Sequence, residues 1–270
     1  FRLARENGIT VTLDGQGADE LLAGYSGYPQ SYIQSLLEKG DYRGMYDFLV
    51  GWAKWPGRSL RQSLRMSILL FLPAELKRFM RNVFGHNAQP AWINSDCFRD
   101  RNVVTANQDI KHSDLEQGRR LPEALRTALT GNGLKSLLRH GDRNSMRWSI
   151  ESRVPFLTTD LAEFLLSLPE SYLLSPEGET KRIFRTAMRG IVPDMLLDRK
   201  DKIGFEIPER EWLVGQGNRI QYWLDTAEDI PLLDAKRCKA EVAAILDGRI
   251  RFSRQAWRLI NFCRWVQLCQ

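Results

Sequence analysis

The chain has 270 residues, of which 43% are hydrophobic and 27% are charged. This composition is typical of a folded domain and excludes a collagen, a coiled coil and a wholly disordered protein. Its 39 Lys and Arg residues against 33 Asp and Glu give a net charge of +6, which favours a polyphosphate ligand without indicating nucleic acid. The length suits one large domain or two ordinary ones. No apolar run is long enough to span a bilayer, so no membrane partner is expected.

The cysteines and histidines do not suggest a metal or redox centre. The four cysteines contain no CxxC pair and are too sparse for a disulfide scaffold, which predicts reduced thiols in a cytoplasmic protein. The three histidines lie far apart in the sequence and are interpreted as surface residues. These seven residues are Cys97, Cys238, Cys263, Cys269, His86, His112 and His140.

The first clear element is a short strand. Residues Phe1 to Asn7 suit the end of a helix, Gly8 ends it, and the β-branched run Ile9 to Leu13 follows. A strand between two helices, followed by a glycine-containing turn, is typical of a buried parallel strand in an α/β sheet. We therefore predict a mostly helical α/β fold with one or few parallel strands. One face or edge of the strand at Ile9 to Leu13 should be unusually uncovered or capped by another chain.

Helical patterns dominate the rest of the chain. The stretch Phe84 to Asp114, rich in Asn, Gln and Asp, is predicted to be a long surface loop. The predicted helices are Gln30–Lys39, Gly44–Trp55, Arg58–Phe71, Pro73–Val83, Leu121–Leu129, Gly133–Ser149, Thr159–Ser167, Gly178–Arg189, Ile207–Val214, Arg219–Leu224, Lys236–Asp247 and Ser253–Cys269.

The segment from Leu13 to Tyr25 follows the predicted strand, at the position where open α/β sheets bind ligands. Gly15 and Gly17 flank Gln16 and would let the backbone approach a ligand, and free N–H groups at the next helix could meet phosphate. An acid such as Asp19 beside a phosphate fits a divalent cation between them. The alternative is structural: the glycines form a tight turn and the acids cap a helix.

Two later segments also carry candidate chemistry. Residues His140 to Leu157 are dense in charge and either form a solvated helix whose Glu151 and Arg153 make surface salt bridges, or hold a buried ion pair. Residues Leu197 to Pro208 form a basic run that could neutralise a bound nucleotide or simply be exposed.

As a set, these segments resemble the synthetase domain of the glutamine-hydrolysing asparagine synthetases, in the PP-loop ATP pyrophosphatase superfamily with its Rossmann-like α/β fold. The resemblance rests on Leu13 to Tyr25, on Asp142 to Met146 with Ile150 to Leu157, and on Lys202 to Pro208 with Trp212-Leu213. Thr180-Lys181 leading into Arg185 to Met188 also fits. The resemblance covers most of the chain, loosely between Gly40 and Leu129 and after Leu213.

The resemblance implies an ATP-dependent ligase. A substrate carboxylate attacks the α-phosphate of ATP, pyrophosphate leaves, and ammonia then displaces AMP to form an amide, as in asparagine biosynthesis. By the same resemblance Asp19 would ligate Mg²⁺ and Lys202 would stabilise charge on the α-phosphate, while Gln16 would orient the acceptor. The nucleotide would meet Gly15, Gly17 and Asp14, and the substrate pocket would be shaped by Asp142, Arg143, Glu151 and Arg153.

The chain departs from the family pattern in two ways. The S-G-G-x-D-S phosphate loop and the glutaminase domain that would supply ammonia are absent, so residues 1–270 are expected to be a partial synthetase domain that does not turn over ATP alone. Gln16 stands where asparagine synthetases have Glu, which opens the alternative of another carboxylate, such as a sugar uronate or a peptide. A homo-oligomer stays open.

A non-enzymatic helical module is the second alternative. Its sequence basis is the interleaving of Arg with aromatic residues from Arg251 to Trp265, which could contact RNA or a partner protein. A core-packed closing helix is the preferred interpretation of that stretch, and no nucleic-acid partner is expected.

Overall fold

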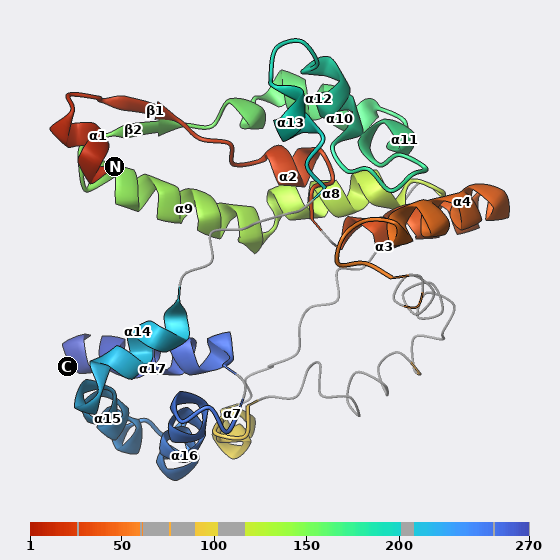
Figure 1. The fold of residues 1–270 in the computed structure, drawn as a ribbon. Coiled ribbons are helices and arrows are strands. Elements are labelled where there is room, and N and C mark those ends of the chain that lie inside the picture. The colour runs from red at the N-terminus through yellow and green to blue at the C-terminus, as the bar shows by residue number, and fades with distance from the viewer. Residues whose placement is uncertain are drawn as a thin grey trace. The chain divides into compact units, whose positions relative to one another are not determined.

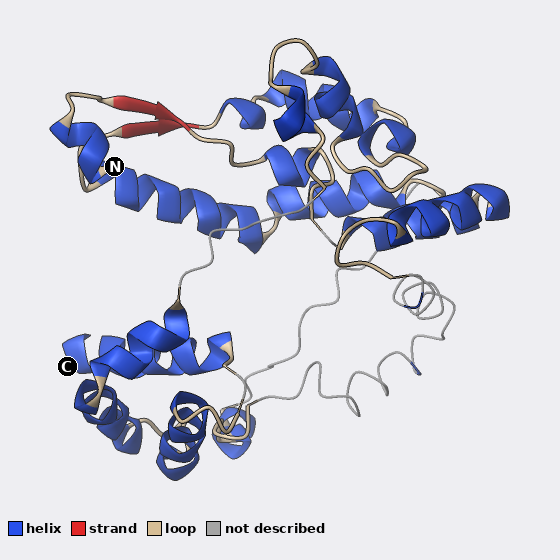
Figure 2. Cartoon of the chain, in the orientation of Figure 1, coloured by secondary structure: helices blue, strands red, loops and turns tan. Residues whose placement is uncertain are grey.

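The computed structural model of the chain describes residues 1–25, 27–59, 61, 76, 90–101, 117–200, 208–250 and 252–269. The chain divides into two compact units: Phe1–Ala74 with Lys111–Lys202, and Glu75–Ile110 with Ile203–Gln270. Each unit has its own buried hydrophobic core. Figure 2 shows helices in both units, and the two strands found among the described residues both belong to the first.

The first unit combines a two-stranded parallel sheet with helices (Figure 1). Its elements are α1 (Arg2–Glu6), β1 (Val11–Leu13), α2 (Ala18–Leu21), α3 (Tyr28–Glu38), α4 (Tyr42–Ala53), α8 (Arg120–Thr130), α9 (Asn132–Met146), β2 (Glu151–Arg153), the 3-10 helix η1 (Pro155–Leu157), α10 (Thr159–Ser167), α11 (Glu170–Leu173), α12 (Arg182–Ala187) and α13 (Asp194–Leu197).

Strand β1 confirms the predicted parallel strand, over fewer residues. Its partner β2 was missed, because Glu151–Arg153 is only three residues long and carries two charged side chains, neither of which favours a strand by itself. The prediction of a buried strand is wrong in part: Val11 and Leu13 are 40% and 75% exposed, so one face of the sheet is uncovered, as expected.

Helix α8 is the centre of the first core. It packs against α2, α3, α9 and α10, which reach it from both halves of the unit's sequence. Leu121 and Leu125, one turn apart on α8, are fully buried, as are Leu21 of α2 and Phe48 of α4. This core fixes α2, and with it the turn that follows β1.

A buried polar junction ties α3, α8 and α11 together. The hydroxyl of Ser35 donates to Glu170 Oε1 at 2.7 Å and accepts from the backbone N–H of Arg120 at 2.7 Å. The backbone N–H of Leu121 donates to the same Glu170 oxygen at 2.9 Å. Burial raises the pKa of the Glu170 carboxyl despite these hydrogen bonds and the nearby Lys39 ammonium.

The second unit is helical throughout its described residues. Trp92 and Asn94, beside α7, exchange backbone hydrogen bonds with the segment before α16. Its elements are α7 (Ser95–Asp100), α14 (Glu209–Gln216), α15 (Asn218–Asp225), the 3-10 helix η2 (Thr226–Asp229), α16 (Ala235–Leu246) and α17 (Arg254–Cys269).

Helix α17 closes the second core. Ala256, Leu259, Ile260 and Cys263 are buried on one face at helical spacing, which confirms the core-packed interpretation of this stretch. All four cysteines are free thiols, as predicted, and burial raises the pKa of Cys238 to about 12.

Two predicted elements are corrected. The helix predicted over Gly178–Arg189 is shorter, Arg182–Ala187, because Thr180 forms an antiparallel bridge with Leu174. The predicted loop Phe84–Asp114 contains α7, and much of the rest of that range lies outside the described residues. The helices predicted over Arg58–Phe71 and Pro73–Val83 also lie almost entirely outside the described residues.

None of the described helices is both long and apolar enough to cross a membrane.

Candidate active site

The parallel sheet brings two of the three predicted segments together. Val11 pairs with Glu151 and Leu13 with Arg153, and the backbone N–H of Asp14 donates to the Arg153 carbonyl at 2.7 Å. Because both strands run the same way, their carboxyl ends lie at one edge of the sheet (Figure 1). The turn after β1 therefore sits beside η1, which follows β2.

The turn itself is built by Asp14 and the two glycines. Asp14 Oδ1 accepts from the backbone N–H of Gln16 at 3.1 Å, so this carboxylate organises the turn. Gly17 has a φ of 93°, and a Cβ there would lie 2.2 Å from the Leu157 side chain, so its lack of a side chain serves packing. Gly15 has no neighbour within 4 Å of a Cβ position, so its backbone is the more open of the two.

Asp19, the predicted metal ligand, forms an ion pair with Lys181. Lys181 Nζ lies 2.7 Å from Asp19 Oδ1, with the two side chains 29% and 27% exposed. The backbone N–H of Lys181 donates to the Leu22 carbonyl at 3.2 Å, which fixes Lys181 beside the end of α2. Lys181 was not among the predicted site residues, although it lies in a segment that resembles the family.

Gly24 makes room for this pair. Its backbone N–H donates to the Asp19 carbonyl at 2.9 Å, and a Cβ at Gly24 would lie 1.8 Å from Asp19 Oδ1. The carboxylate therefore occupies the space that any other residue would fill at this position. We call this space beside Gly24, which the Asp19 carboxylate fills, the cradle. It lets the carboxylate lie against the Lys181 ammonium.

The next acid, Glu20, has a different role. Its side chain is buried and accepts from the Tyr25 hydroxyl at 2.9 Å. Burial, together with this hydrogen bond, raises the pKa of Tyr25. Glu20 thus holds the segment after α2 in place.

Glu151 and Arg153 form an exposed pair on β2. Arg153 Nε lies 2.8 Å from Glu151 Oε1, and both side chains are more than half exposed. The hydrogen bond from Arg153 lowers the pKa of the Glu151 carboxyl, and the same bond raises the pKa of Arg153. The alternative of a buried ion pair is therefore wrong, and so is the assignment of these residues to a helix, since they form β2.

Asp142 and Arg143 lie in the last part of α9, and both are exposed. Helix α9 contacts β2, which places the two residues in the same region of the unit as Glu151 and Arg153 (Figure 1). Their side chains therefore face solvent, where a substrate could reach them.

Lys202 lies outside the described residues, but Leu197, Arg199 and Lys200, a few positions before it, contact other parts of the first unit. The Arg185 guanidinium donates to the carbonyls of Leu197 and Arg199, the second at 3.0 Å. The Lys200 ammonium lies 5.8 Å from the centre of the Trp55 ring, a cation–π contact.

Asp19 would be the residue to hold a Mg²⁺ ion, as the family resemblance implies. Among the described residues no group of three or more His, Cys, Asp or Glu side chains could hold a metal. Mg²⁺ is commonly bound through one or two carboxylates and the phosphates of a nucleotide, so a single carboxylate in a cradle suits that mode.

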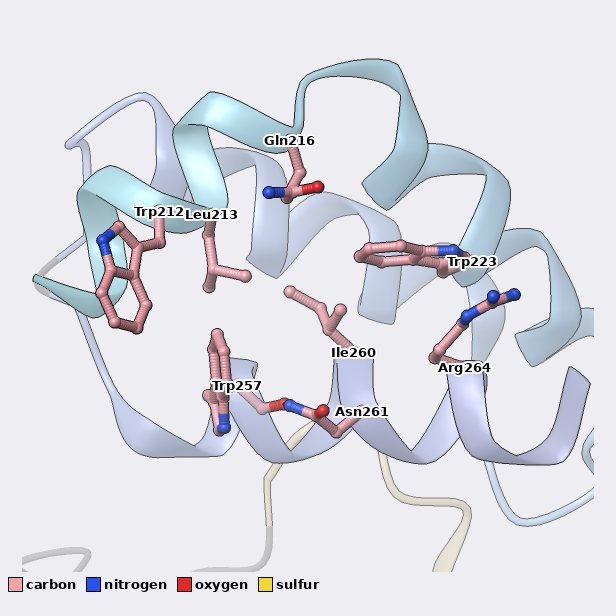
Figure 3. A pocket seen from close by; sticks show the side chains of 8 residues that line it. All are labelled: Trp212, Leu213, Gln216, Trp223, Trp257, Ile260, Asn261 and Arg264. Atoms are coloured by element: carbon pink, nitrogen blue, oxygen red, sulfur yellow. The ribbon is translucent and has the colours of Figure 1, made fainter. Parts of the chain in front are cut away.

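A pocket of about 360 Å³ in the second unit contains none of the predicted site residues. Side chains of α14, α15 and α17 surround it, including Trp212, Trp223 and Trp257 (Figure 3). The Arg264 guanidinium lies 5.6 Å from the Trp223 ring centre at one side of the pocket.

Comparison with known proteins decides the family. A sequence profile described as asparagine synthase matches residues 1–267, nearly the whole chain. The chain belongs to the asparagine synthase family. Glutamine-hydrolysing asparagine synthetase 1 of Bacillus subtilis is 26% identical over 289 residues, 95% of this chain and 40% of that protein. A Mycobacterium tuberculosis protein provisionally named as a glutamine-hydrolysing asparagine synthetase is 27% identical over 298 residues, 98% of the chain and 40% of its own length.

This asparagine synthase family chain thus spans about two fifths of the length of these relatives. Asparagine synthetase 3 of Bacillus subtilis matches a shorter stretch, with 34% identity over 93 residues, or 34% of the chain and 14% of that protein. No solved structure matches the chain.

Proposed function

We propose that this chain is part of a synthetase domain that forms an amide from a carboxylate, ammonia and ATP, with asparagine synthesis from aspartate as the first candidate reaction. The family profile over residues 1–267 carries the proposal. Its support within the structure is the turn of Asp14 to Asp19 at the carboxyl edge of a parallel sheet, where α/β folds bind ligands. A PP-loop fold, a homo-oligomer and a cytoplasmic location belong to the same proposal.

In the first step an oxygen of the substrate carboxylate attacks the α-phosphorus of ATP, and the bond to the pyrophosphate oxygen breaks. The open backbone at Gly15 would approach the nucleotide, and Asp19 would hold Mg²⁺. That ion supplies charge neutralisation on the polyphosphate when bound. Lys202 would stabilise the negative charge that develops on the α-phosphate, the kind of electrostatic stabilisation that usually dominates such catalysis.

In the second step the nitrogen of ammonia attacks the acyl carbon, AMP leaves and a proton is released. We infer that the ammonia comes from a glutaminase domain outside these residues, because the relatives are named for glutamine hydrolysis and are longer than the chain. The exposed residues Asp142, Arg143, Glu151 and Arg153 would shape the entrance for the carboxylate substrate. The exposed Glu151–Arg153 pair could exchange partners with an incoming carboxylate and amine.

Because residue 16 is Gln, the carboxylate substrate is open between aspartate and an alternative such as a sugar uronate or a peptide. It is neutral, so it cannot act as a base and would orient the acceptor through its amide. Carboxylate-dependent pyrophosphate release, measured with aspartate and with a panel of uronates and peptides, tests the proposal. We expect Gln16→Glu to shift the ranking of the panel more than the total turnover of ATP. Pyrophosphate release that no carboxylate stimulates would contradict the proposed function.

A further inference from the structure

The Asp19–Lys181 ion pair combines four features that packing alone does not require. The two charged groups lie 2.7 Å apart, on α2 and just before α12, in segments some 160 residues apart in sequence. Gly24 provides the cradle for the carboxylate, as described above. Lys181 and Ala23 both have positive φ, 58° and 56°, and the Lys181 backbone bonds to Leu22 next to Ala23.

The positive φ values carry a cost. A residue with a side chain loses about 1–2 kcal/mol in the left-handed conformation, so two such residues at one contact need compensation from their surroundings. Strained backbone of this kind concentrates at functional sites. Lys181 is thus held where its ammonium meets Asp19, at the expense of local strain.

The geometry points to Lys181 as a placeholder cation: its ammonium neutralises Asp19 while no metal is bound, and Mg²⁺ must displace it from the same carboxylate oxygen. This inference rests on the proposed function, which makes Asp19 the metal ligand. Two cations beside one carboxylate oxygen repel each other, so the metal and the lysine compete. Once displaced, Lys181 is free to pair with a phosphate oxygen of the nucleotide, so the site exchanges one counter-ion for another.

Binding of Mn²⁺ to the metal-free chain, without nucleotide, tests the competition directly. We expect Lys181→Met to bind Mn²⁺ at least about fivefold more tightly than the wild type, a change equivalent to about 1 kcal/mol. Lys181→Arg, which keeps the cation, should stay near the wild-type affinity. Lys39→Met is the matched control, since Lys39 pairs with Glu170 at 3.5 Å elsewhere in the same unit and its loss should not change Mn²⁺ affinity.

The melting temperature of each variant, with and without Mn²⁺, gives a second measurement beside the binding affinity. We expect Lys181→Met to melt at a lower temperature than the wild type without metal, and Mn²⁺ to raise its melting temperature by more than it raises that of the wild type. If Lys181→Met does not fold, Lys181→Gln replaces it.

Adding Asp19→Asn to each background separates the inference from the proposed function. Tighter binding in Lys181→Met that disappears in the double variant supports the competition. Equal binding in the wild type and Lys181→Met, with both lost on Asp19→Asn, leaves Asp19 as the metal ligand but overturns the competition. Binding that Asp19→Asn does not affect overturns the metal role itself. Absence of Mn²⁺ binding in every variant overturns the competition as well.

Discussion

Single residues around the turn after β1 have contacts that define their roles. Gly17 packs on Leu157, and the missing side chain of Gly24 leaves room for the Asp19 carboxylate. Of the described residues other than glycine, three have positive φ, namely Ala23, Ser149 and Lys181. Each lies in or beside a segment on which the family resemblance rests, which is where backbone strain is expected in a functional site.

A double-mutant cycle tests the cradle at Gly24. We expect Gly24→Ala to lower the free energy of unfolding by roughly 0.5–1 kcal/mol, because its new Cβ displaces the Asp19–Lys181 ion pair. A partly exposed ion pair contributes up to about 1 kcal/mol to stability. The loss should largely vanish in an Asp19→Ala background, where no pair is left to displace. Gly133→Ala, whose Cβ meets nothing within 4 Å, is the control and should be additive with Asp19→Ala in urea unfolding. Additivity of Gly24→Ala as well would contradict the cradle.

Replacement of the predicted catalytic lysine tests the adenylation step. In an enzyme that carries this sequence, we expect Lys202→Ala to slow pyrophosphate formation by roughly 100-fold, about 2.7 kcal/mol, while nucleotide affinity changes little. That pattern marks an interaction made chiefly in the transition state. Single-turnover kinetics together with equilibrium ATP binding measure the two effects. A variant with nearly normal pyrophosphate formation would remove Lys202 from the proposed chemistry.

At the scale of elements, periodicity predicted most helices well and short elements poorly. The helix over Thr159–Ser167 has the predicted bounds, α16 begins and ends one residue earlier than predicted, and α17 begins one residue later than predicted. Strand β2 was missed because its formation depends on pairing with β1, 140 residues earlier, rather than on its own residue types. In α17 the arginines and aromatics are conspicuous in the sequence, but the buried stripe consists of Ala256, Leu259, Ile260 and Cys263.

Sequence reasoning also predicted one part of the candidate site and missed another. Sequence reasoning placed the Asp14–Asp19 turn after a parallel strand and left a structural role for the glycines open, and Gly17 indeed packs. It could not find Lys181, because nothing in its neighbourhood along the chain indicates that Asp19 lies 2.7 Å away. Contacts between distant segments follow from the packing of α2 against the rest of the core, which a local pattern does not encode.

The junction of α3, α8 and α11 predicts a pH dependence of stability. The Glu170 pKa is raised in the folded chain by burial, so the folded state keeps this proton at pH values where the unfolded state has lost it. Its contribution to stability is therefore complete below the unfolded pKa and declines as the pH rises through the folded one. Glu170→Gln keeps an oxygen for Ser35 and Leu121 but does not titrate, so its stability relative to the wild type should improve from acidic to neutral pH.

Urea unfolding at a series of pH values measures this difference. Glu6→Gln is the control, because Glu6 is exposed and pairs with Arg2 at 3.5 Å on α1. An equal pH dependence for Glu170→Gln and Glu6→Gln would show that burial of Glu170 does not control the effect.

For the molecule as a whole, every predicted site residue that the structure describes belongs to the first unit. The family match covers residues 1–267 and so extends over both units. The exposed side chains of Val11 and Leu13 leave one face of the small sheet open in this unit.

Transfer of oxygen from the carboxylate to AMP is the most direct test of adenylation by an enzyme that contains this chain. The substrate, aspartate first and then the most active member of the uronate and peptide panel, is labelled with a heavy oxygen isotope in its carboxylate. Attack on the α-phosphate predicts that the AMP released with the amide carries one labelled oxygen and that the pyrophosphate carries none. Label in inorganic phosphate, with ADP as the nucleotide product, would show an acyl phosphate instead and would contradict the proposed chemistry.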